Sequence, residues 1–256
     1  MKLSITIIGH NEAEHLQELL PTLEWADEVV YVDCESRDNS LEIARRWNCR
    51  CFCRPNLANL NINKAYAMEQ ARGEWIFYLD PDERIPPELA REIRRVILAP
   101  EPFHAFQLNR RNHYFGRWLR FGSQYPDVQL RLFRKGYASF PQQHVHEKPR
   151  VQGRIGRLQN DMLHFPYRNI SQFLKKFDFY TSFEADYMYR QGIAVSWWNG
   201  FKYLFWIPIL RFLRRYGLKM GFRDGLPGFF ACVFDALNFV VRYLKLWELY
   251  RQRDCR

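Results

Sequence analysis

The stretch WIFYLDPDER, residues 75–84, joins an apolar run to a group of acidic side chains. Residues Trp75–Leu79 are aromatic or aliphatic throughout, which predicts a buried strand. Asp80 and Asp82 follow as soon as the apolar run ends. The sequence therefore predicts a strand that delivers two carboxylates to a turn at its carboxyl end.

Strand and helix patterns alternate on both sides of this stretch. The other expected strands are Leu3–Ile8, Val29–Val32 and Cys51–Cys53. Expected helices lie over Glu12–Leu23 with a break at Pro21, from Asn39 or Ser40, over Ile62–Ala71, and from Pro86–Pro87. This alternation predicts an α/β fold with a parallel sheet and helices on both faces, in which ligands bind beyond the carboxyl ends of the strands.

Polar side chains follow each expected strand, where such ligands bind. They are Asn11 and Glu12 after the first strand, Asp33 after the second, Lys64 at the helix start after the third, and Asp80 after the fourth. None of these turns has the glycine spacing of a dinucleotide fingerprint or a P-loop, which argues against both kinds of site.

Several motifs in a fixed order make a more specific case. They are IIGHNE (7–12), WADEVVYVD (25–33), SRDNS (36–40), ARGEW (71–75) and DPDER (80–84). This order resembles family 2 glycosyltransferases. The later RLFR (131–134), VHE (145–147) and LH (163–164) resemble the bacterial branch that adds sugars to the lipopolysaccharide core. The resemblance covers roughly the first 170 residues and implies a GT-A fold, which is Rossmann-like with a mixed, mainly parallel sheet.

The resemblance also implies a nucleoside-diphosphate sugar donor, a divalent metal and an inverting transfer. A departing diphosphate accumulates negative charge, which Mg²⁺ or Mn²⁺ held by hard oxygen ligands neutralises. By analogy with the family, Asp82 is the direct metal ligand, Asp80 serves ribose and metal, and Asp33 holds the base or ribose. Pro81 stands where the family commonly has a small residue, so the identity of the donor sugar and nucleotide is not determined. A UDP-hexose is the default by analogy.

Inverting transfer needs a base that takes the proton of the acceptor hydroxyl. The turn at residues 80–83 is called the Asp80 corner. Glu147 is the candidate base and His146 its competitor, because both lie in a polar segment about 65 positions beyond this corner. The alternative for this segment is a surface loop without chemistry. Lys64 and Arg131 are candidates for contacts with the donor phosphates, and solvated surface charge is the alternative for both.

The C-terminal part of the chain is basic and aromatic. The formal charge is +10, and residues 197–256 hold 11 Lys and Arg against 4 Asp and Glu together with 16 of the 43 aromatic residues. We expect a GT-A domain over residues 1–168 and a helical extension over 169–256, with a first helix capped by Ser171 and two more over Trp197–Tyr216 and Leu226–Tyr250. No stretch appears long enough to span a membrane, because Asp235 interrupts the best one.

Basic residues interleaved with aromatic ones suit an anionic membrane surface, from which a lipid-linked acceptor would be reached. The start of the chain has no signal-peptide pattern, so we expect a cytoplasmic hexosyltransferase on the inner face of the membrane. No nucleic-acid-binding motif accompanies the charge. The alternatives are a transferase acting on polyprenyl phosphate and a degenerate basic scaffold protein.

Overall fold

The computed structural model describes residues 1–57, 59–141 and 149–254. The chain divides into two compact units. Unit 1 consists of Met1–Arg110 and Asp127–His164, and unit 2 of Arg111–Pro126 and Phe165–Arg256. The domain boundary that the sequence predicts between residues 168 and 169 remains a prediction.

Unit 1 begins with alternating strands and helices, as the sequence predicts. In chain order these are β1 (Leu3–Gly9), α1 (Ala13–Leu19), the 3₁₀ helix η1 (Leu20–Leu23), β2 (Glu28–Asp33), α2 (Ser40–Arg46), β3 (Arg50–Cys53), α3 (Leu60–Gln70), β4 (Trp75–Leu79), β5 (Glu83–Arg84) and α4 (Pro87–Leu98). The later strands are β6 (Phe103–Tyr114), β8 (Asp127–Arg134), β9 (Ala138–Ser139), β10 (Arg150–Val151), β11 (Arg154–Arg157) and β12 (Met162–Tyr167).

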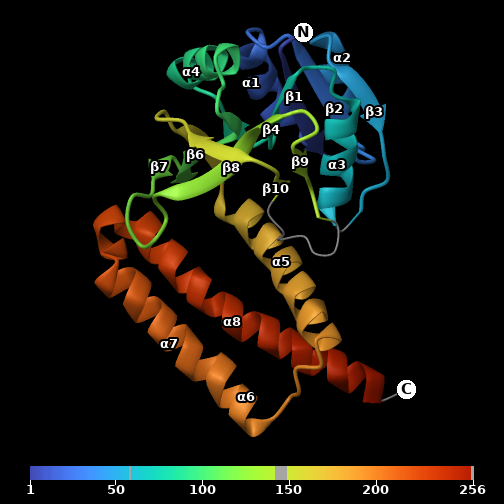
Figure 1. The fold of residues 1–256 in the computed structure, drawn as a ribbon. Helices are drawn as coiled ribbons and strands as arrows, with labels where there is room; N and C mark the ends of the chain where they lie inside the picture. Colours follow the sequence, from blue (N-terminus) through green and yellow to red (C-terminus); the bar gives the residue numbers. More distant parts are fainter. Residues whose placement is uncertain (58, 142–148, 255–256) are drawn as a thin grey trace. The chain divides into compact units, whose positions relative to one another are not determined.

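The sheet has a parallel half and a mixed half. Its strand order is β3-β2-β1-β4-β8-β6-β12-β5, and Figure 1 shows the four parallel strands β1 to β4 together in blue to teal. The strand β8 pairs antiparallel with both β4 and β6. Parallel pairing of β1 with β2 and β4, and of β2 with β3, brings their carboxyl ends to one edge.

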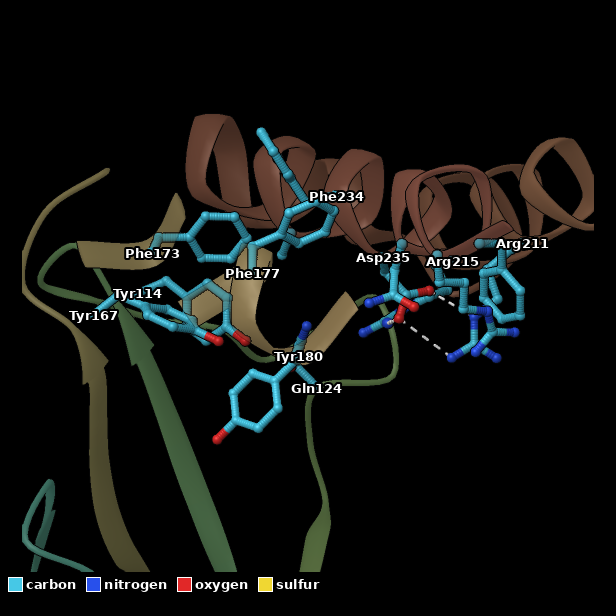
Figure 2. Close-up of a pocket in the computed structure, with 14 residues that line it drawn as sticks. Tyr114, Gln124, Tyr167, Phe173, Phe177, Tyr180, Arg211, Arg215, Phe234 and Asp235 are labelled. Atoms are coloured by element: carbon cyan, nitrogen blue, oxygen red, sulfur yellow. Dashed lines mark hydrogen bonds and ion pairs between the residues drawn. The ribbon is translucent and has the colours of Figure 1, made fainter. Parts of the chain in front are cut away.

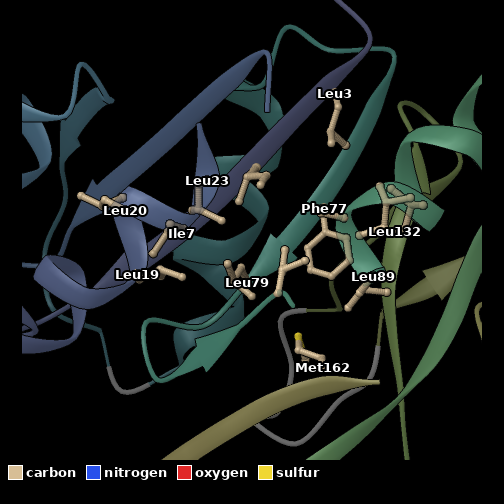
Figure 3. Close-up of a cluster of buried hydrophobic side chains, with 14 of the residues drawn as sticks. Leu3, Ile7, Leu19, Leu20, Leu23, Phe77, Leu79, Leu89, Leu132 and Met162 are labelled. Carbon is tan, nitrogen blue, oxygen red and sulfur yellow. The ribbon is translucent and has the colours of Figure 1, made fainter. Parts of the chain in front are cut away.

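Alternate residues of β1 and β4 face opposite layers of helices. Ile5 and Phe77 belong to a core that also contains residues of α1, α2 and α4, whereas Ile76 packs in a second cluster with Met68 of α3. Figure 3 shows the first core, with Phe77 among leucines from several elements. The helices therefore cover both faces, and the α/β prediction is confirmed.

Gly73 in the turn before β4 is required by a close approach of two backbones. A Cβ atom at this position would lie 2.6 Å from the backbone nitrogen of Ser4. The Gly73 N–H donates to the Ser4 hydroxyl at 2.8 Å, and the neighbouring Arg72 N–H donates to the buried carboxylate of Glu28 at 2.9 Å. Residues 71–75 thus set the position of β4 beside β1.

Unit 2 is built mainly of helices. It contains β7 (Arg117–Trp118), α5 (Ile170–Arg190), α6 (Trp197–Phe201), the π-helical η2 (Lys202–Trp206), α7 (Ile207–Phe212), the π-helical η3 (Leu213–Leu218), η4 (Gly221–Asp224) and α8 (Gly225–Asp254). Figure 1 shows α6, α7 and α8 in orange to red. The cap of α5 is Asn169, whose side chain accepts from the Gln172 N–H, so the expectation of a Ser171 cap was wrong by two residues.

Helix α8 continues through Asp235 without a break. Of the described helices, only Gly221–Gln252 is long and apolar enough to cross a membrane, and core helices of soluble proteins satisfy the same criteria. The sequence-based expectation that Asp235 excludes such a stretch was therefore wrong. A single acidic residue leaves the helix apolar enough on average. The Asp235 carboxylate is paired with Arg211 at 2.6 Å and also with Arg215.

Candidate functional site

The polar residues expected after the strands meet at the carboxyl edge of the parallel half. Gly9 pairs with Asp33 at the end of β1 and β2, and Ile7 pairs with Leu79 one residue before Asp80. The sheet therefore brings the loops after β1, β2 and β4 together, and these loops are separated by up to about seventy residues in the chain.

The loops after β1 and β2 are joined by hydrogen bonds between backbone N–H groups and side-chain oxygens. Asn11 has a positive φ of 56°, and its side-chain carbonyl accepts from the Arg37 N–H at 2.8 Å. Its own N–H donates to the Ser36 hydroxyl at 3.0 Å. Glu12 caps the start of α1, where its N–H donates to the Ser40 hydroxyl at 2.8 Å. Asn11 and Glu12 thus lie at the edge, with backbone roles that shape the turn.

Asp33 at the end of β2 is buried, with 4% of its surface exposed. One carboxylate oxygen accepts from the Ser36 N–H at 3.0 Å, and the other accepts from the Tyr31 hydroxyl at 3.3 Å. The loop around it is therefore preorganised by the carboxylate itself.

Asp80 is surrounded by hydrogen-bond donors and two cations. Its carboxylate accepts from the Tyr78 hydroxyl and from Arg131 Nη2 at 3.0 Å, and Lys64 Nζ lies 3.5 Å away. Burial alone would raise the pKa of Asp80, but Lys64 and Arg131 outweigh it and hold the pKa well below its usual range. Asp80 is consequently a fixed anion, and the structure brings together three of the sequence-predicted site residues.

The ring of Tyr78 contacts the same two cations. Lys64 Nζ is 4.4 Å and Arg131 Cζ is 4.2 Å from the ring centroid. Burial raises the pKa of the Tyr78 hydroxyl, which keeps it protonated as the donor to Asp80. Burial lowers the pKa of Lys64, and the nearby Asp80 offsets part of this effect. A further anion beside Lys64 would therefore be stabilised.

Glu83 stabilises the Asp80 corner through its buried carboxylate, and the sequence did not predict it as a functional residue. Its side chain is fully buried and accepts from Arg131 at 2.6 Å, from Arg110 at 2.9 Å and from the Asp80 N–H at 3.0 Å. The only sequence signal was a third acidic residue directly after Asp80 and Asp82. Arg110 also pairs with Asp127 at 2.9 Å, which ties β6 and β8 to the corner.

Asp82 has an imidazole neighbour that was not singled out from the sequence. His164 Nε2 lies 3.5 Å from an Asp82 carboxylate oxygen, because antiparallel pairing of β12 with β5 places His164 opposite Glu83. The side chains of Asp82 and His164 are 15% and 14% exposed, so solvent still reaches both. The sequence signal for His164 was its place in the LH motif at residues 163–164.

The donor set at this corner suits a hard divalent cation that shares its coordination with phosphates. Within residues 1–57, 59–141 and 149–254 no group of three His, Cys, Asp or Glu side chains is arranged as a closed metal site. Mg²⁺ and Mn²⁺ bind commonly through one or two carboxylates plus substrate phosphates and water, so an open set fits them. Asp82, with His164 beside it, and Asp80, which also accepts from Tyr78 and Arg131, are the carboxylates that could hold such a cation.

The two candidate bases, His146 and Glu147, lie outside the described residues. The described chain on either side is fixed near the corner. Residues Ala138–Ser139 pair with Arg150–Val151, and the Pro141 carbonyl accepts from the Asn61 side chain at 3.2 Å. The ring of Phe140 packs edge-on against Tyr78 with the centroids 5.4 Å apart.

Comparison with known proteins agrees with this geometry. The model of the glycosyl transferase family 2 matches residues 4–152. A lipopolysaccharide core biosynthesis glycosyltransferase, LpsC of Rhizobium meliloti, is 26% identical over 97% of this chain and 93% of its own length. A mannosyltransferase from Pyrobaculum calidifontis, solved with GDP-Man and Mn²⁺, superposes over 96% of this chain and 87% of its own with a TM-score of 0.56 at 13% identity. S. aureus TarS 1–349 in complex with UDP-GlcNAc covers 98% of this chain and 92% of its own, with a TM-score of 0.51 at 17% identity.

The fold and the acidic corner define a glycosyltransferase of the GT-A class. The chain belongs to glycosyl transferase family 2, whose model matches more than half of it.

Proposed function

We propose that this glycosyltransferase moves a hexose from a nucleoside-diphosphate sugar, with UDP as the default nucleotide, to a hydroxyl of a glycolipid of the lipopolysaccharide-core type. The observation that carries the proposal is the pairing of Asp82 with His164 beside the cationic cluster around Asp80. The similarity to LpsC along nearly the whole chain supports the acceptor class.

Asp82 and His164 would hold the divalent metal, which when bound supplies positive charge against the departing diphosphate. Asp80 contributes by orienting its neighbours, since its carboxylate keeps Lys64 and Arg131 at the edge of the sheet. Asp33, Asn11 and Glu12 line the neighbouring loops and would meet the base and ribose.

Lys64 and Arg131 would serve the donor phosphates. Lys64 is buried enough for its pKa to be lowered, so a phosphate oxygen nearby would relieve the cost of its charge. Arg131 is held by Asp80 and Glu83 beside Lys64, so its positive charge is fixed at the same place and would attract the phosphates.

The acceptor hydroxyl would attack the anomeric carbon while the bond from that carbon to the diphosphate oxygen breaks. Its proton would pass to the Glu147 carboxylate, with His146 as the competing base. The location of the flanking residues supports this assignment, because Phe140 packs against Tyr78 and Tyr78 donates to Asp80.

We further propose that unit 2 rests on the inner surface of the cytoplasmic membrane. A stripe of large apolar side chains along α6, η2, α7 and η3 is exposed: Trp197 74%, Phe201 46%, Phe205 55%, Ile209 55% and Leu213 56%. These residues recur every four positions, so each lies next to the following one on the surface of the helical segment. Lys202, Lys219 and Arg223 provide positive charge in the same unit, as anionic lipid requires.

Metal-dependent donor binding tests the catalytic part. In a thermal-shift titration with UDP-hexoses, Mn²⁺ is expected to strengthen donor binding in the parent and to have little effect in Asp82→Asn, because the amide lacks the charge that holds the cation. The matched control is Asp178→Asn, which changes an exposed carboxylate in unit 2. Equal metal dependence in all three proteins would refute the assignment of Asp82.

A further inference from the structure

A pocket of about 420 Å³ lies within unit 2, formed by α5, α8, α7, η3 and the segment around residues 114–124. Figure 2 shows its two contrasting ends: aromatic rings at one end, and Arg211, Arg215 and Asp235 at the other. The volume falls in the range of small-molecule sites, which is roughly 300–1,000 Å³. None of the roles assigned above uses this pocket.

The aromatic end is a preformed platform. Tyr167 and Phe234 both pack edge-on against Phe173, with centroids 4.7 and 4.9 Å from it, and Phe177 lies edge-on to Phe234 at 5.4 Å. Interlocking of this kind fixes the rings before any ligand arrives. The faces of such rings are electron-rich and favour the polarised C–H groups of a pyranose, which lie on one face of the sugar ring.

The basic end carries more positive than negative charge. Asp235 is shared by Arg211, at 2.6 Å, and Arg215, so one carboxylate serves two guanidinium groups. Within the part of the chain that the structure describes, Arg242 pairs with Glu184 at 3.4 Å. Three guanidinium groups thus face two carboxylates in a partly buried setting, which leaves room for an anion.

Arg242 is the least satisfied of the three. Its side chain is 17% exposed and its guanidinium lies over the Phe239 ring at 4.0 Å. Its buried Nε has no hydrogen-bond partner among the described residues. Burial lowers the pKa of Arg242, and Glu184 offsets only part of that effect. A ligand that brought negative charge and acceptor oxygens would satisfy both the charge and the free N–H.

We propose that this pocket binds an anionic saccharide, a sugar ring bearing a phosphate or carboxylate, with the ring on the aromatic platform and the anionic group at Arg242 and Arg211. Given the proposed function, this saccharide is part of the acceptor glycolipid. The enzyme then recognises its acceptor in unit 2 by a charged sugar, separately from the donor corner in unit 1.

Direct binding tests the proposal on the full chain with the donor corner saturated by UDP and Mg²⁺. The probes are glucose 6-phosphate, glucose and inorganic phosphate, measured by calorimetric titration. Glucose 6-phosphate is expected to bind more tightly than either fragment, because it engages both ends of the pocket. Arg242→Gln and Arg211→Gln are each expected to weaken it by about tenfold or more, as for the loss of a charge-assisted hydrogen bond.

Arg214→Gln is the matched control, since it removes the same charge from an exposed position of η3 outside the pocket. It is expected to bind the probe like the parent. If Arg242→Gln fails to fold, Arg211→Gln still decides, because the Arg211 side chain is 43% exposed. Equal affinity for glucose 6-phosphate in the parent and both pocket variants would overturn the proposal.

A phospholipid headgroup is the other source of such an anion, and phosphatidylglycerol vesicles distinguish it. If the pocket variants lose vesicle binding while glucose 6-phosphate binds none of the proteins, the pocket takes lipid and the saccharide proposal is wrong. The proposed transferase function fails by a separate result, namely absence of UDP binding in the parent.

Discussion

Replacement of Arg131 by Met is expected to destabilise unit 1 strongly. Arg131 Nη2 bridges Asp80 at 3.0 Å and Glu83 at 2.6 Å, and its side chain is only 4% exposed. Without it, the fully buried Glu83 carboxylate keeps Arg110 as its remaining ion-pair partner among the described residues. Removing one member of a buried ion pair costs about 3–5 kcal/mol, and here Glu83 and Asp80 each lose one of their two cations.

The control lies on the same strand. Arg134 is 33% exposed and meets Glu74 at 3.5 Å and Glu101 at 4.0 Å, so Arg134→Met is expected to cost about 0–1 kcal/mol. Both substitutions remove one arginine from β8 and leave a side chain of similar length, so they differ mainly in burial.

Amide hydrogen exchange of β4 and β8 is the suitable assay, because it reports the free energy of opening unit 1 without interference from unit 2. The most protected amides of β4 are expected to lose about 3–5 kcal/mol in Arg131→Met and to stay near the parent values in Arg134→Met. Equal losses in the two variants would refute the reasoning that the buried bridge, rather than the general charge of β8, stabilises the corner.

Three further results are expected. Glu147→Gln removes the proposed base but keeps its shape, so transfer rates should fall by about 10²–10⁴-fold with donor affinity unchanged, and near-normal turnover would eliminate Glu147 from this role. Trp197→Glu combined with Phe205→Glu places charge on the exposed stripe and should abolish flotation with anionic vesicles, whereas flotation equal to the parent would exclude the stripe from membrane contact. Because the pKa of Asp80 is depressed in the folded state, its carboxylate stabilises unit 1 above about pH 4, and this contribution is lost as the pH falls further. Asp80→Asn should therefore lose less stability than the parent between about pH 5 and 2. Equal loss of melting temperature in the two proteins over this range would contradict the expectation.

Local patterns were sufficient to predict the parallel half of the fold. The strand Trp75–Leu79 has the bounds expected from its apolar run, and the break at Pro21 separates α1 from η1. Lys64 was predicted from its place at the helix start after the third strand, and Arg131 from the RLFR motif. The structure places both at Asp80. These features depend on short-range chemistry or on residues that directly follow a strand.

The remaining features depend on partners far apart in the sequence. His164 meets Asp82 because of the register between β12 and β5, and no local pattern determines that register. Asp235 looked like an interruption of α8, since its partners Arg211 and Arg215 lie more than one helix turn away on another segment. Residues 111–126 belong to unit 2 because of contacts with residues far along the chain, which no local pattern predicts.

The strand β4 serves two layers at once: Phe77 fills the first core, while Tyr78 points to the opposite face and holds Asp80. Insertion or deletion of one residue within the strand would exchange the two rings, placing a phenol hydroxyl among leucines and removing the clamp on the carboxylate. Drift in substrate choice among related enzymes is therefore expected to accumulate in the turns that follow the strands, while the length of this strand stays invariant.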